Sequence, residues 1–324
     1  MSSFKDLVFQ LLDPIPQYVS GCLPGLAIMG ESPANTRTQK LTWLLRCLGC
    51  PFTGLFYAIN VGGKKESRVA YWLSSNRFVT KRGTEPEFKP FGFYACEINI
   101  GDDIYIKEFI DRCTAKVSIL EIFSACVSGY FTLVGVMALI SKATGTISCT
   151  GWPYLPSLLS WTLPAIWRRI RSGNTVIKDP DDIFEEHQIR VVENHKSRSS
   201  KRITVFITAA IAIFYPWITL LLAYFSRPIG YGCRSKFITL FCGTWSLNSI
   251  LAFICHVTGE KSLICHQGKN PKFKETISEV LHIWFAFCGA IVFVLLIFLA
   301  FLTKNNQWWV DLFGNSCSVA SIGC

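Results

Sequence analysis

The chain of 324 residues is 50% hydrophobic and 14% aromatic, and only 17% of its residues are charged. Soluble globular chains carry about 25% charged residues, so this composition argues against a soluble domain and favours contact with lipid. The net charge of +10 fits basic loops beside a membrane. No run interleaves bases with stacking aromatic residues, as nucleic-acid-binding modules do, so nucleic acid is not an expected partner.

The N-terminal region, residues 1–118, is predicted to be interfacial or cytoplasmic, with mixed and partly soluble structure. It holds two apolar stretches, Leu7–Met29 and Leu41–Val61. Prolines interrupt the first stretch, and an arginine and the Cys50-Pro51 pair weaken the second. The two stretches are either interfacial helices or two additional membrane spans. No convincing signal-peptide cleavage site follows the first stretch, so insertion is expected to depend on internal segments.

Five stretches further along the chain approach the length of about 20 mainly apolar residues that a transmembrane helix needs. They are 119–140, 147–167, 203–225, 237–257 and 280–302. The predicted fold class is therefore an all-α integral membrane bundle, residues 119–302, of about five transmembrane helices. Seven helices are the alternative, if both N-terminal stretches also span.

The stretch 147–167 differs from the others because it contains Pro153, Pro156 and Pro164. Membrane helices tolerate proline where neighbouring groups satisfy the freed carbonyls. We expect a short, kinked span here, with a re-entrant segment as the alternative.

The basic residues predict the orientation, because short cytoplasmic loops are enriched in Lys and Arg. If all five stretches span, sixteen bases fall on one side and five on the other. The larger group includes the bases of the charged loop 168–202. This loop is therefore predicted to be cytoplasmic and the tail 303–324 non-cytoplasmic, in the plasma membrane or a membrane of the secretory pathway.

Four cysteines fall on the predicted non-cytoplasmic side, where an oxidising compartment allows disulfides to form. They are Cys149, Cys233, Cys317 and Cys324, and four cysteines allow three pairings. The alternative is that they are free, small and partly buried side chains.

Two Cys-His pairs lie ten residues apart, and their side chains are of the types that bind zinc. The four residues are Cys255, His256, Cys265 and His266. Adjacent ligand pairs do not match the spacing of a standard zinc finger. We therefore expect no metal site and no cofactor, with these four residues as the alternative metal ligands.

No residue is predicted to be catalytic. The chain has no nucleophile elbow, phosphate-binding loop or HExxH motif, each of which carries a defined chemistry. Charge is nearly absent inside the predicted spans, which argues against a proton-coupled pump.

Polar and small residues inside the predicted spans are interpreted as packing groups. Asn248, with Ser246 and Ser249, is expected to hydrogen-bond a neighbouring helix. The pairs Ala125-x3-Gly129 and Ala286-x3-Ala290 would allow two helices to approach closely.

Several stretches in the second half of the chain resemble an uncharacterised group of fungal multi-pass membrane proteins. They are GWPYLPSLLSWTLPAIWRRIRSGNTVIKDPDDIFEEHQ, IFYPWITLLLAYF, PIGYGCRSKF and QWWVDLFG. The resemblance implies a membrane protein and carries no activity, cofactor or site.

Three functions are compatible with these features. The favoured one is a receptor- or scaffold-type interaction protein, with the bilayer as one partner and proteins bound through its cytoplasmic loops as others. A passive transporter or channel is the alternative, because proline-broken segments can line a cavity. A lipid-active enzyme using Asp181, Glu185 or His187 is the second alternative, although the missing motifs speak against an enzyme.

Overall fold

The computed structural model describes 11 segments of the chain. They are residue 25 and residues 37–61, 79–81, 114–144, 157–172, 174–176, 191–193, 200–225, 230–231, 233–258 and 271–302. These segments are almost entirely helical. The helices are α3 (Arg37–Gly49), α4 (Pro51–Val61), α8 (Ile119–Ala143), the 3-10 turn η2 (Ser160–Thr162), α10 (Leu163–Ser172), α12 (Ser200–Phe225), α13 (Cys233–Thr258) and α14 (Pro271–Leu302).

Four strands of three residues each join segments that are distant in the sequence. β1 (Val79–Lys81) pairs in parallel with β4 (Val191–Glu193). β2 (Thr114–Lys116) pairs antiparallel with β3 (Asn174–Val176). The second pair matters for the site described below, because it ties the residues just before α8 to those just after α10.

Among the described residues, three helices are long and apolar enough to cross a membrane: Ile119–Ser141 in α8, Val205–Phe225 in α12 and Ser235–Cys255 in α13. A shorter apolar stretch, Val280–Leu296, lies within α14. The prediction of a helical chain with helices long and apolar enough to span a membrane is confirmed. The total of five spans stays a prediction.

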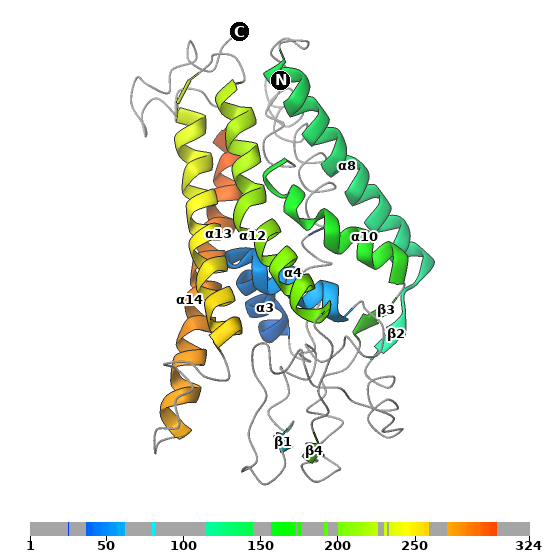
Figure 1. Ribbon diagram of the computed structural model, residues 1–324. Helices are drawn as coiled ribbons and strands as arrows, with labels where there is room; N and C mark the ends of the chain where they lie inside the picture. The colour runs from blue at the N-terminus through cyan, green and yellow to red at the C-terminus, as the bar shows by residue number, and fades with distance from the viewer. Residues whose placement is uncertain are drawn as a thin grey trace, which may run out of the picture.

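The long helices run alternately along one common direction (Figure 1). α8, α12 and α14 run upwards in this view and α13 runs downwards, while α10 slopes downwards and ends beside the start of α8. α12 and α13 pack along each other, and α8 packs against α10 and α12. The chain therefore returns from the upper to the lower end between α8 and the end of α10.

This return includes the stretch 147–167, for which the sequence predicts a short, kinked span, and that span stays a prediction. Its described part consists of a helical turn, then η2, then α10, which begins at Leu163 and continues to Ser172. Pro164 explains the start of α10, because proline is tolerated in the first turn of a helix, where its missing N–H costs least. Arg169 and Arg171 lie in the last turn of α10, where bases complement the helix dipole. The first residues of the charged segment 168–202 are thus helical.

The start of α8 is fixed by a reciprocal cap. The Ser118 backbone N–H donates to the Glu121 carboxylate at 3.0 Å, and the Glu121 N–H donates to the Ser118 hydroxyl at 3.2 Å. This capping box satisfies two donors that a helix leaves open at its N-terminus. Glu121, the acid at the edge of the predicted first span, is therefore a capping residue.

Two glycines allow α3 to cross α14 in backbone contact. A Cβ built on Gly49 would lie 2.6 Å from the Gly289 nitrogen, and one built on Gly289 would lie 2.9 Å from the Gly49 nitrogen. Real Cβ atoms do not approach that closely, so only glycine fits at either position. Ala125 is fully buried and Gly129 faces Ile166 of α10, which confirms the small-residue contact predicted for α8. On α14 the residue that approaches the backbone of α3 is Gly289, which lies between Ala286 and Ala290 in the sequence.

Candidate functional site: the helix break at Cys50

The apolar stretch Leu41–Val61 folds as two short helices, α3 and α4, separated at Cys50. Pro51 opens α4, a position that proline favours because its fixed φ suits a first turn and its missing N–H would be unpaired there. Neither helix has the length to cross a bilayer. α3 packs on α14, and α4 packs on α10, α12 and α13. The break therefore lies inside the helix bundle.

Side chains of α13 bind both ends of the break. The Trp245 indole N–H donates to the Leu48 carbonyl at 2.7 Å, and the Asn248 amide donates to the Gly49 carbonyl at 2.8 Å. On the α4 side, the Phe52 backbone N–H donates to the Ser249 hydroxyl at 3.3 Å. We call Trp245, Asn248 and Ser249 the clamp. These bonds supply partners for carbonyls and N–H groups that a helix end cannot satisfy by itself.

The clamp is itself held in place from α14. The Trp284 indole N–H donates to the Asn248 side-chain oxygen at 3.1 Å, while the Cys50 thiol approaches the Asn248 carbonyl at 3.5 Å. Asn248 and Ser249 are buried. Asn248 thus connects the break, α13 and α14. The prediction that Asn248 and Ser249 hydrogen-bond a neighbouring helix is confirmed.

Ser246 confirms the same prediction on another side of α13. Its hydroxyl donates to the Ile213 carbonyl at 2.8 Å and accepts from the Trp217 indole at 2.7 Å. These bonds lie beside Pro216 within α12, where proline removes one intrahelical donor. The polar side chains of α13 therefore bind the backbone at the break between α3 and α4, and they also bind α12 near Pro216.

The break also contains a Cys-x-x-Cys spacing, Cys47 to Cys50, that the sequence analysis did not use. This spacing signals a redox or metal site when the first thiol is accessible and its pKa is lowered. Here both thiols are buried. Burial raises the pKa of Cys47 to about 12 and also raises the pKa of Cys50. Both side chains are therefore protonated at neutral pH, which is unsuitable for thiol exchange.

We expect Cys47 and Cys50 to resist alkylation in the folded protein. At pH 8 a water-soluble maleimide should label neither thiol, because the reagent needs an accessible thiolate. Complete labelling should follow unfolding in denaturant, and peptide mass spectrometry resolves the two positions. Rapid labelling of Cys47 at pH 8 under native conditions would contradict the buried, protonated state.

Two buried donors near the break lack a hydrogen-bond partner among the described residues: Arg46 Nε and Trp161 Nε1. The Arg46 guanidinium lies 5.1 Å from the ring centre of Trp43, within the range of a cation–π contact. Trp161 meets Trp245 of the clamp edge to face at 5.7 Å.

Of the residues predicted from the sequence as disulfide or metal candidates, the structure describes only those on α13. Cys233 is the first residue of α13, and Cys255 and His256 lie in its last turn. The other candidates, Cys149, Cys265, His266, Cys317 and Cys324, lie outside the described residues, as do Asp181, Glu185 and His187. Among the side chains that the structure describes, no group of three or more His, Cys, Asp or Glu could hold a metal ion.

Comparisons with protein-family models, curated proteins and solved structures find no match. The part of the chain that the structure describes is helical, with three helices long and apolar enough to span a membrane, and this defines the class of the protein. The resemblance to fungal multi-pass membrane proteins stays a prediction.

Proposed function

We propose that the protein is a receptor- or scaffold-type membrane protein that binds other proteins through its charged segment 168–202. One observation supports this function over transport. In transporters with broken helices, the open ends of the half-helices hold the substrate or its coupling ion. Here the Leu48 and Gly49 carbonyls and the Phe52 N–H are already bound by Trp245, Asn248 and Ser249.

The clamp therefore favours a fixed frame. Polar groups that bond each other inside a bundle hold the helices in one arrangement. The backbone contact between Gly49 and Gly289 also holds the helices in one arrangement, because α3 cannot approach α14 any further. A rigid frame suits a protein whose exposed segments present a constant surface to a partner.

The test is site-specific photo-crosslinking in the full-length protein in its own membrane. A photoreactive residue is placed at Lys178 or Lys196, within the charged segment, and at Phe214, an exposed apolar position of α12, as the matched control. We expect the first two positions to link to one and the same protein, and Phe214 to link to lipid. Adducts to lipid alone at all three positions would contradict the proposal.

A passive transporter is the second candidate, and Arg46 is the observation that favours it. A cation within a membrane bundle is costly and often marks an ion or substrate pathway, and its Nε has no partner among the described residues. An uptake assay in proteoliposomes distinguishes the two functions. Uptake of small anions that Arg46→Gln abolishes would favour transport, whereas the scaffold function predicts no uptake in either protein.

A further inference from the structure

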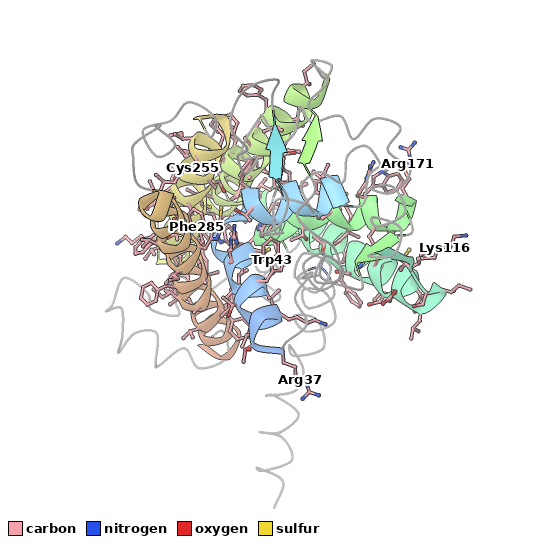
Figure 2. The ribbon with its side chains drawn as sticks, turned by 90° about the horizontal axis from the view of Figure 1, so that it is seen from below. Arg37, Trp43, Lys116, Arg171, Cys255 and Phe285 are labelled. Atoms are coloured by element: carbon pink, nitrogen blue, oxygen red, sulfur yellow. The ribbon has the colours of Figure 1, made fainter. Side chains whose placement is uncertain are left out.

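The end of α10 and the start of α8 bring three bases to one edge of the molecule. In the β2–β3 pair, Lys116 lies opposite Asn174, which follows Arg171 by three residues. Three residues span at most about 10 Å, so the β2–β3 pair keeps Lys116 and Arg171 on the same edge of the molecule. Both side chains project from the same side of the molecule (Figure 2). Arg168, one turn before Arg171, is the third base.

The two faces of α10 have different roles. Ala165, Ile166 and Arg169 are buried against the bundle, while Trp167 is 66% exposed and Arg171 is exposed. The Arg168 Nε is buried and has no hydrogen-bond partner among the described residues. An exposed indole beside guanidinium groups is typical of the membrane–water interface, where tryptophan sits at headgroup level. Arginine also binds phosphate in a bidentate geometry.

An exposed apolar surface continues from this edge along α8. Ile119 is 87% exposed, Leu120 77% and Phe123 64%, and they follow Lys116 directly in the chain. The order along the surface is therefore bases first and apolar side chains next. A phospholipid has the same order, with a phosphate headgroup followed by acyl chains. Glu121, the acid in this turn, is engaged by the Ser118 backbone N–H at 3.0 Å.

We propose that Lys116, Trp167, Arg168 and Arg171, called here the basic edge, bind the headgroup of an anionic phospholipid. The bases contact the phosphate and any carboxylate of the headgroup, and the indole packs beside the glycerol region. The acyl chains lie on Ile119, Leu120 and Phe123. The site is separate from the helix break, so it holds for a scaffold and for a transporter alike.

The experiment measures lipid affinity by native mass spectrometry of the full-length protein. Phosphatidylserine and phosphatidylcholine with identical acyl chains are compared on the wild type and on the double variant Arg168→Gln/Arg171→Gln. A base near a membrane surface contributes about fivefold in affinity for anionic lipid, so the double variant should bind phosphatidylserine about 25-fold more weakly. Its affinity for phosphatidylcholine should not change.

The matched control removes the same charge elsewhere. Arg37 and Lys40 are exposed bases on α3, and the variant Arg37→Gln/Lys40→Gln should keep the wild-type affinity for phosphatidylserine. An equal loss in this control would overturn the proposal, because the effect would then be one of net charge. Equal phosphatidylserine affinity in the wild type and the Arg168/Arg171 variant would also overturn it.

Two further measurements complete the test. The single variant Arg171→Gln changes an exposed side chain and should fold as the wild type does, with about a fivefold loss of phosphatidylserine affinity. Glycerol 3-phosphate, a soluble phosphate, should not displace the lipid at equal concentration. Displacement would assign the basic edge to a soluble phosphorylated ligand and would overturn the lipid assignment.

Discussion

Gly289→Ala is expected to destabilise the protein by about 3 kcal/mol or more, because the new Cβ would collide with backbone atoms. The nearest obstacle is the Leu45 carbonyl oxygen of α3, and the Gly49 nitrogen lies 2.9 Å from the Cβ position. A backbone atom cannot rotate away as a side chain can. The helices must separate, which exposes the break. Thermal unfolding in mild detergent, followed by size-exclusion chromatography, measures the loss.

Gly243→Ala is the matched control for this substitution. Gly243 lies within α13, and a Cβ built there has no atom within 4 Å. Alanine is favoured over glycine inside a helix by about 1 kcal/mol, so this variant should be neutral or slightly stabilised. Gly49→Ala should resemble Gly289→Ala. The double variant should cost less than the sum of the two, because both methyl groups obstruct one crossing. A Gly289→Ala protein as stable as Gly243→Ala would contradict the close crossing.

The long spans could be predicted from the sequence because their signal is local. The stretches 119–140, 203–225 and 237–257 each coincide with a helix long and apolar enough to cross a membrane. Hydrogen bonding by Asn248 could also be predicted, since an amide in an apolar segment needs a partner. The identity of that partner could not, because Gly49 lies 199 residues away in the chain.

At the helix break, the local sequence does not specify the tertiary contacts. The Cys50-Pro51 pair correctly weakened the prediction of one span across Leu41–Val61, but proline does not specify what binds the two freed ends. The match between Gly49 and Gly289 is visible only once α3 and α14 are placed side by side. Within the stretch 147–167, Trp161 is fully buried against Trp245, a tertiary contact that the apolar run alone does not specify.

Asn248→Leu is expected to destabilise the protein by about 1–4 kcal/mol, because it removes the partners of one buried carbonyl and of one partly buried indole N–H, and a buried polar group without a partner costs about 1–3 kcal/mol. One is the Gly49 carbonyl, which accepts from the Asn248 amide at 2.8 Å. The other is the Trp284 indole N–H, which donates to the Asn248 side-chain oxygen at 3.1 Å. Leucine has the same branched skeleton of four side-chain heavy atoms as asparagine, so the substitution creates no cavity and the loss reports the hydrogen bonds.

Thr244→Val on the same helix is the matched control. The Thr244 hydroxyl donates to the Leu240 carbonyl at 2.9 Å, an acceptor that the helix backbone already uses, so its removal should cost less than about 0.5 kcal/mol. Alkylation gives a second readout. Release of α3 from the clamp should make Cys47 and Cys50 reactive in Asn248→Leu under conditions where Thr244→Val stays unlabelled. If the two variants unfold at the same temperature and label alike, Asn248 does not hold the helix break in place.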